Sequence, residues 1–471
     1  MRNEVEAKPP RAVVAAVQLP GVSDVELEES LNELRELAKT LGFEVVGTFM
    51  QKRTRFDTAA YLGTGKRQEM RRFVENQPAH EHGPGLPAPA GVPKAPKSGA
   101  ARAKEAAQAE ADPETRRADI ILVDHEISPS QARNLEIEVG CEVMDRTMVI
   151  LEIFHRHARS GAARAQVEIA RLGYMAPRLR EAAKLAGPKG RQRSGVGGRG
   201  AGEAHSELDR KKIRDRIAEL QKEIDAMDSQ RETQRARRQA RQGLARAALI
   251  GYTNAGKSTL MRALTGSEVL VADKLFATLD TTVRALHPEG VPRVLVSDTV
   301  GFIKNLPHDL VASFKSTLEE AVEASLLVHV VDASDPGFER QIAVTEKVLD
   351  EIGALAVPRL RVFNKIDQIG DAAAQTGREA ALRAQYPECI VMSAVRKNDI
   401  VKLHKVIRGF FQRDLVEAEL FLPWSAQQLR GDLFAICEVL EERAEGEGAL
   451  FRVRGESSAI EGLRERFGQA G

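Results

Sequence analysis

The octapeptide Gly251–Ser258, which reads GYTNAGKS, constrains the fold more than any other feature of the chain. It follows a short apolar run, Ala247–Ile250, and precedes a helical pattern that reaches Leu264 and closes at Gly266. The spacing GxxxxGKS between a strand and a helix is typical of a phosphate-binding loop, in which backbone N–H groups and the positive end of the helix surround phosphate oxygens. An ordinary glycine turn would not need both flanking elements, so we expect a parallel α/β sheet that binds a nucleotide here.

Each position of this loop has an expected role. Lys257 should reach the β- and γ-phosphates and so take part in catalysis, and the hydroxyl of Ser258 should ligate Mg²⁺. The rest of the loop should wrap the phosphates, which assigns nucleotide contacts to Gly251, Tyr252, Thr253, Asn254, Ala255 and Gly256.

A second motif follows the strand-like run Val294–Ser297, where Asp298, Thr299, Val300 and Gly301 read DTVG. Asp298 stands where a carboxylate would hold Mg²⁺, directly or through a water. Gly301 can give its backbone N–H to the γ-phosphate, which would make it a catalytic hinge that senses hydrolysis. We expect all four residues of this motif to contact the nucleotide or its metal.

A third motif points to the base. The run Leu360–Phe363 ends in Asn364, Lys365, Ile366 and Asp367. A carboxylate can accept the N1–H and the exocyclic N–H of guanine together, whereas adenine has no such pair of donors. Asp367 is therefore the expected specificity residue, with Asn364 bracing the loop and the stem of Lys365 lying over the base.

The run Ile390–Met392 then ends in Ser393, Ala394 and Val395, whose backbone can donate to guanine O6. Each of these short motifs is weak alone, but they follow one another in order, each at the carboxyl end of a strand. The pattern resembles the Ras-like GTPase fold, in which nucleotides bind at that edge of the sheet. An ATP-dependent enzyme is the alternative, and it requires that Asp367 does not recognise guanine.

The segment FATLD lies between the phosphate-binding loop and Asp298, where a Ras-like GTPase has its first switch loop. Within it, Thr278 is the candidate to ligate Mg²⁺ only when the γ-phosphate is present, and hence to serve catalysis; Thr281 and Thr282 are close rivals. Nucleotide contacts are expected along the whole segment, from Phe276, Ala277, Thr278, Leu279 and Asp280.

Phe302 follows Gly301, at the position where Ras-type enzymes carry the glutamine that orients the attacking water. A phenyl ring cannot hydrogen-bond that water. Either another group positions it, or hydrolysis is slow in the isolated protein and a partner stimulates it. We favour the second interpretation.

The rest of the chain predicts three further domains around a GTPase domain at 247–413. Residues 1–150 alternate strand-like and helical runs, as in an α/β domain, but 77–117 lacks periodic apolar residues and is expected to be a disordered insertion. Residues 414–471 predict a small α/β domain in the order strand, helix, strand, helix.

Residues 151–246 predict a basic helical hairpin. A helix over Val149–Lys184 and a second over Glu207–Met227 would pack antiparallel, with the glycine–arginine loop Arg193–Gly202 at the tip. The second helix has a narrow apolar seam, which fits hairpin packing or an intermolecular coiled coil, formed by Ile213, Ile217, Leu220, Ile224 and Met227. Alternatively, the basic residues of this hairpin form a charged helix face that is exposed only to solvent.

Composition narrows the cellular setting. The 471 residues include 69 Lys and Arg and 68 Asp and Glu, a net charge of +1, so attraction to a polyanion must come from local clusters. No run approaches the ~20 apolar residues of a membrane span, and Met1–Pro10 lacks the apolar run of a signal peptide. Three scattered cysteines are too few for a disulfide framework or a zinc site. We expect a cytoplasmic protein without stable membrane insertion.

The motifs together resemble the HflX family of GTPases. The match includes GYTNAGKST, DKLFATLD and DTVGF in the GTPase part, YLGTGK and SPSQARNL upstream, and the glycine–arginine loop. Two places depart from the family pattern: Thr281 stands where proline is typical, and 200–205 read GAGEAH rather than a GPGETQ-like run.

The resemblance implies a Mg²⁺-dependent enzyme that hydrolyses GTP to GDP and binds the large ribosomal subunit, with its Arg/Gly hairpin on rRNA. Family members can split ribosomes, notably stalled ones, and we expect a monomer off the ribosome. Arginines on a flexible glycine-rich tip are suited to RNA phosphates. The alternative is a signalling switch whose helical region binds a protein partner and never touches RNA.

Overall fold

The computed structural model describes residues 9–75, 117–186, 210–227, 245–266, 275–276, 282–304 and 315–468. These residues divide into two compact units, one within Met1–Ile153 and Arg171–Arg214, the other within Phe154–Ala170 and Asp215–Gly471. The predicted insertion at 77–117, apart from Arg117, and the predicted loop Arg193–Gly202 lie outside the described residues. None of the described helices is both long enough and apolar enough to cross a membrane.

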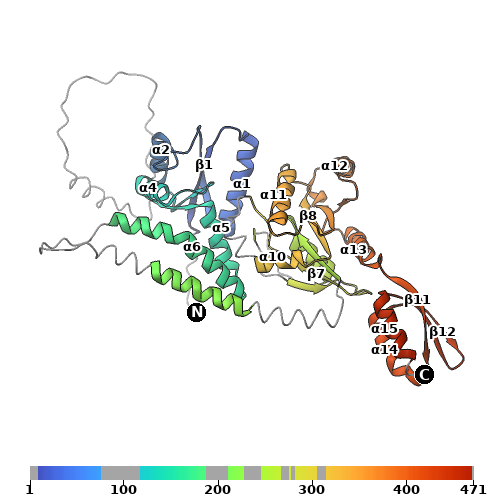
Figure 1. Ribbon diagram of the computed structural model, residues 1–471. Helices are drawn as coiled ribbons and strands as arrows, with labels where there is room; N and C mark the ends of the chain where they lie inside the picture. Colours follow the sequence, from blue (N-terminus) through green and yellow to red (C-terminus); the bar gives the residue numbers. More distant parts are fainter. Residues whose placement is uncertain are drawn as a thin grey trace, which may run out of the picture. The chain divides into compact units, whose positions relative to one another are not determined.

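A four-stranded parallel sheet, of which Figure 1 labels β1, forms the centre of the N-terminal part. Its strand order is β2-β1-β3-β4. Its strands are β1 (Arg11–Gln18), β2 (Glu44–Lys52), β3 (Ile120–Val123) and β4 (Glu142–Asp145). All residues of β3 and nearly all of β1 are buried, as expected for a parallel sheet covered on both faces. The predicted α/β character of this part is confirmed.

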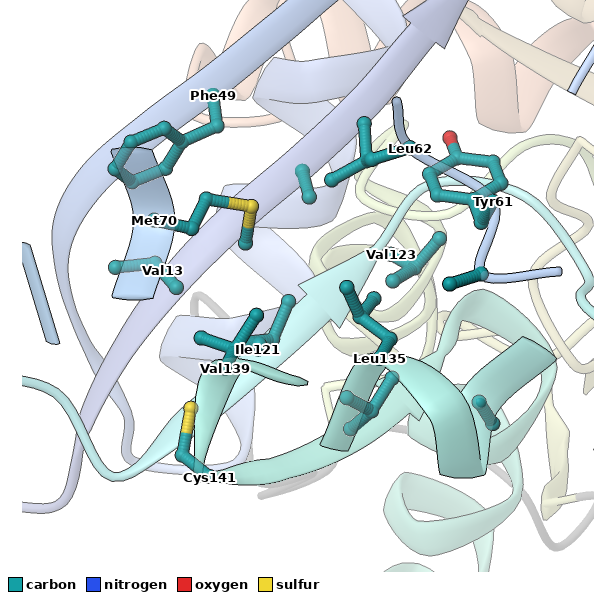
Figure 2. Close-up of a cluster of buried hydrophobic side chains, with 14 of the residues drawn as sticks. Val13, Phe49, Tyr61, Leu62, Met70, Ile121, Val123, Leu135, Val139 and Cys141 are labelled. Carbon is teal, nitrogen blue, oxygen red and sulfur yellow. The ribbon is translucent and has the colours of Figure 1, made fainter. Parts of the chain in front are cut away.

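Helices cover both faces of this sheet. On one face, α2 (Thr64–Val74) and α4 (Pro129–Val139) bury Met70, Leu135 and Val139 against the strands. Figure 2 shows Met70 beside Val13 and Leu135 beside Val123. On the other face, α1 (Asp24–Thr40) buries its leucine stripe. Leucines at helical spacing explain why this segment forms one long helix.

The predicted helix Val149–Lys184 is wrong in one respect, because the structure has two helices there: α5 (Arg146–His157) and α6 (Gly161–Ala186). Ser160 starts the second helix, since its side chain accepts a hydrogen bond from Ala163 N at 3.1 Å. Such a cap competes with helix continuation through the same residue. The cap fixes a new helix start inside the apolar pattern.

A further helix at 210–227 carries the predicted apolar seam, of which Leu220 and Ile224 are buried. It lies antiparallel to the first turns of α6. Arg216 Nε donates to Glu168 Oε1 at 3.2 Å, and Met227 lies against Gly161.

The second sheet has six strands in the order β10-β9-β8-β5-β7-β6 and is parallel except for β6. The strands are β5 (Ala245–Ile250), β6 (Thr282–Ala285), β7 (Val294–Asp298), β8 (Leu326–Asp332), β9 (Arg359–Asn364) and β10 (Ile390–Val391). Every nucleotide motif predicted at a strand end follows β5, β7, β9 or β10. The structure therefore confirms the α/β fold around the phosphate-binding loop.

Helices pack on both faces of this sheet as well. On one face, α8 (Lys257–Thr265) and α13 (Lys397–Gln412) bury Leu260, Met261, Leu403 and Ile407. On the other face, α11 (Phe338–Glu351) and α12 (Ala372–Gln385) close a smaller core around Phe363. The short elements α10 (Lys315–Val322) and η1 (Ile366–Gln368) complete this part.

The C-terminal part is an antiparallel sheet in the order β11-β13-β12. It comprises β11 (Val416–Pro423), η2 (Trp424–Leu429), α14 (Arg430–Ile436), β12 (Glu438–Glu445), β13 (Gly448–Gly455) and α15 (Ser457–Gly468). The predicted order of strand, helix, strand and helix missed one strand. Gly446, with φ +56°, turns β12 directly into β13, so a tight hairpin replaces a single long strand.

His329 is a titratable side chain buried at the centre of the second sheet, on β8 opposite Arg361. Burial, together with the charges of Arg361, Arg359 and Lys257, lowers the pKa of this imidazole to about 3. The unfolded chain binds a proton at its ordinary pKa of about 6.5, so acid favours unfolding as the pH falls below that value.

We therefore expect His329→Leu to flatten the pH dependence of stability. Between pH 7 and 5 the wild-type sheet should lose about 2 kcal/mol through this histidine, and the variant should not. Scanning calorimetry across this pH range measures the difference. An unchanged pH dependence in the variant would contradict the assignment.

Candidate nucleotide-binding site

The phosphate-binding loop leaves β5 and enters α8 with two glycines in conformations that side chains rarely adopt. Gly251 has φ +141°, and a Cβ there would lie 2.1 Å from Val330 O. Gly256 has φ +95°, and a Cβ there would lie 2.3 Å from Asn364 Nδ2. Both positions therefore require glycine, and the second one brings the loop against the segment predicted to bind guanine.

Lys257 is buried at the start of α8. Its Nζ donates to Gly251 O at 3.0 Å and to Tyr252 O at 2.7 Å. Burial lowers the pKa of Lys257 to about 8, an effect that the Asp298 carboxylate opposes and Lys365 adds to. The loop carbonyls thus hold the ammonium group inside the loop that should receive the phosphates.

The two predicted metal ligands of the described chain lie side by side. Ser258 Oγ donates to Asp298 Oδ2 at 2.8 Å, and Asp298 is buried at the end of β7. A hydroxyl and a carboxylate oxygen are hard ligands of the kind that Mg²⁺ takes in addition to waters and phosphates. The described residues hold no cluster of three or more His, Cys, Asp or Glu side chains that could bind a metal by itself.

The DTVG segment is tied to the phosphate-binding loop. The hydroxyl of Thr299 donates to Leu249 O at 2.7 Å, and Val300 is buried. A Cβ on Gly301 would lie 2.9 Å from Thr253 Cα and 3.0 Å from Lys257 Nζ. Gly301 is therefore required for this segment to approach the lysine.

Phe302 is turned into the protein and is only 1% exposed. Its backbone pairs with the loop, because Thr253 N donates to Phe302 O at 2.7 Å and Phe302 N donates to Gly251 O at 3.1 Å. The tyrosine of the loop joins this contact, since Tyr252 OH accepts from Lys304 N at 2.8 Å. The residue at the usual water-orienting position thus serves packing and backbone pairing.

Asn364 connects the phosphate side of the site to the base side. Its Nδ2 donates to Ala255 O at 2.9 Å, and its Oδ1 accepts from Ala394 N at 2.9 Å. Asn364 is 1% exposed, so both contacts are shielded from water. The bracing role predicted for this residue corresponds to these two bonds.

The remaining residues of the base side come from two strand ends. Lys365 has φ +62° and its Nζ lies 2.8 Å from Asp332 Oδ2, while Ile366 is buried. Asp367 is half-buried, and no described residue forms a hydrogen bond or ion pair with its carboxylate. That carboxylate can therefore accept hydrogen bonds from a ligand.

Ser393, Ala394 and Val395 form the second base-side loop. Ser393 N donates to Asp399 Oδ2 at 3.1 Å, which holds the loop against the start of α13. Ser393 is buried, whereas Val395 is 72% exposed. Asp332 and Asp399 were not among the residues predicted from the sequence. Asp332 ends a strand and Asp399 lies in the first turn of a helix, and these positions are the signals that could have found them.

Of the predicted first switch segment, Phe276 to Asp280, only Phe276 is described. Phe276 has φ +56° and is 3% exposed. Its ring packs edge-on against Phe154 of α5, with centroids 4.5 Å apart. Ala277, Thr278, Leu279, Asp280 and Thr281 lie outside the described residues, so the choice of Thr278 over its rivals stays a prediction.

Three family models match the chain in succession. The one described as the N-terminal part of a GTP-binding GTPase matches 28–81 and 96–155. The middle region of a GTP-binding GTPase matches 157–238, and a 50S ribosome-binding GTPase matches 246–365.

Curated relatives match over most of their length. GTPase HflX of Gluconacetobacter diazotrophicus is 52% identical over 98% of this chain and 99% of its own. GTPase HflX of Escherichia coli is 39% identical over 71% of this chain and 76% of its own. Among solved structures, a GTP-binding protein from Sulfolobus solfataricus in complex with GDP is 22% identical, with a TM-score of 0.42, and covers 84% of this chain and 99% of that chain.

The lowered pKa of Lys257 predicts that nucleotide affinity falls at alkaline pH. Contact with phosphate raises this pKa, so above about pH 8 the protein must take up a proton to bind. We expect affinity for GDP to fall by up to tenfold per pH unit there, with proton uptake in titration calorimetry in two buffers. Lys257→Arg is the matched variant, because guanidinium does not titrate and the pH dependence should disappear.

Asp367 should decide the choice of base. In Asp367→Asn, the amide N–H₂ cannot accept the guanine donors, so affinity for GDP should fall by about 100-fold or more. The same amide can donate to the C2 carbonyl of xanthine, so xanthosine diphosphate should bind the variant better than the wild type. Equal affinity of both proteins for GDP would favour the ATP-dependent alternative.

Proposed function

Because the chain belongs to the HflX family of GTPases, we propose that it binds the large ribosomal subunit in its GTP form and that hydrolysis to GDP releases it. The family model for the GTPase part, described as a 50S ribosome-binding GTPase, supports this partner. We propose that binding splits ribosomes or rescues stalled ones.

The site residues take the following proposed roles. Lys257 neutralises the β- and γ-phosphates once it leaves the loop carbonyls, while Ser258 and Asp298 hold Mg²⁺, which would stabilise charge that develops on the phosphates. Gly301 donates its N–H to the γ-phosphate, and Thr278 completes the metal site in the GTP state. Asp367 and the loop at Ser393 select guanine.

The burial of Phe302 is the observation that carries the dependence on a partner. Its ring lies in the core, its backbone is paired with the phosphate-binding loop, and phenyl carbon cannot orient water. Hydrolysis by the isolated protein is therefore slow, and the ribosome stimulates it by ordering the catalytic residues around the water.

We further propose that 151–246 act as an RNA-binding hairpin between an N-terminal domain at 1–150 and the GTPase domain at 247–413, with a fourth domain at 414–471. The ion pair between Arg216 and Glu168 and the contact of Met227 with Gly161 support antiparallel packing of its two helices. The arginines of the loop would then meet rRNA phosphates in a salt-dependent contact. We also propose that the protein is monomeric when it is not bound to the ribosome and that it works in the cytoplasm.

GTP hydrolysis should be measured with the purified protein, alone and with purified large subunits, at two salt concentrations. We expect stimulation of about tenfold or more at low salt, which weakens steeply as salt rises. The variant Arg191→Gln/Arg193→Gln/Arg199→Gln should lose most of the stimulation and keep its basal rate. Hydrolysis that ribosomes do not change, with no co-sedimentation in the GTP form, would instead support a switch that acts on a protein partner.

A further inference from the structure

Helix α13 has an exposed face on which every charged side chain is positive. Lys397, Lys402, Lys405 and Arg413 at its C-cap are exposed, and Arg408 is half-buried beside them. The one carboxylate of the helix, Asp399, is mostly buried, accepts from Ser393 N, and lies 3.7 Å from Lys402 Nζ. That lysine side chain nevertheless remains 75% exposed.

Helix α11, on the opposite face of the same sheet, does not share this asymmetry. On α11 the exposed charged residues mix signs: Glu339, Arg340, Lys347, Asp350 and Glu351. Mixed signs are what an ordinary solvated helix face shows. Since the whole chain has a net charge of only +1, the concentration of cations on α13 is a local feature.

The exposed lysines of α13 are not needed to hold the helix in place, whereas Arg408 lies against Gly290. Leu403 and Ile407 are fully buried against the sheet and anchor the opposite face. Val401 and Val406, between the lysines, are 54% and 43% exposed. The cationic face is therefore free to meet a ligand, while its position is fixed by packing.

We propose that this face, from Lys397 to Arg413, binds the phosphate backbone of RNA. At 1.5 Å per residue it extends for about 24 Å, long enough to follow several consecutive phosphates. Lysine is depleted in protein–protein interfaces but is a common partner of nucleic-acid phosphates, so RNA fits better than an acidic protein surface.

This inference rests on the proposed function for the identity of the RNA, which would be rRNA of the large subunit. It adds a second RNA contact, which lies on the GTPase part itself and is separate from the contact proposed for the glycine–arginine loop Arg193–Gly202. Because α13 begins directly after the base-side loop at Ser393–Val395, the RNA contact would lie next to the guanine site.

The test compares Lys402→Gln/Lys405→Gln with Lys347→Gln/Arg383→Gln, which removes the same charge from α11 and α12. Binding to purified large subunits and to a protein-free fragment of their rRNA is measured with a non-hydrolysable GTP analogue at several salt concentrations. We expect the α13 variant to bind the subunits and the rRNA fragment about 10- to 50-fold more weakly at 0.1 M salt. The slope of the logarithm of the binding constant against the logarithm of salt concentration should become shallower by about 1.4 to 1.8. The control variant should bind the subunits and the rRNA fragment as tightly as the wild type does. Both variants should keep the wild-type affinity for GTP.

The outcomes separate the two proposals. Wild-type protein that binds rRNA through α13 but ignores intact subunits would support the RNA contact and overturn the ribosomal function. If the wild type and the α13 variant bind subunits with the same affinity and the same salt dependence, the RNA contact alone is overturned. Weaker binding of the variant to subunits with unchanged binding to rRNA would assign the face to a protein partner, which also overturns it.

Discussion

The buried amide of Asn364 is the interaction on which the nucleotide site depends. One planar group donates to Ala255 O in the phosphate-binding loop and accepts from Ala394 N in the base-side loop. The amide group cannot rotate without breaking these hydrogen bonds, and a buried polar group left unsatisfied costs about 1–3 kcal/mol. The distance between the places for phosphate and for base is thereby set before a ligand arrives, and Gly256 is the residue that makes room for the amide.

The strands around the candidate site could be predicted from the sequence, because each motif lies at the end of a short apolar run. The roles of the individual site residues stay predictions. The strands that precede Gly251, Asp298, Asn364 and Ser393 are all present, and parallel pairing places their ends at one edge. The glycine at 266, predicted to close a helix, does so with φ +63°.

The features that sequence reasoning missed depend on contacts between distant residues or on single turns. Asp332 pairs with Lys365, and Phe154 packs on Phe276, across separations that no periodicity records. The cap at Ser160 and the turn at Gly446 each change the element count through one residue. An apolar pattern that continues through such a residue does not reveal the break, so boundaries of this kind need tertiary information.

The pairing of Phe302 with the phosphate-binding loop has a mechanical consequence. The backbone of Phe302 is joined to Gly251 and Thr253 by two hydrogen bonds, which form a single parallel bridge. Gly301, the residue proposed to donate to the γ-phosphate, directly precedes Phe302, so this pairing restrains its backbone on one side. Any displacement of Gly301 therefore acts against these two backbone hydrogen bonds, each of which contributes about 0.5–1.5 kcal/mol to stability.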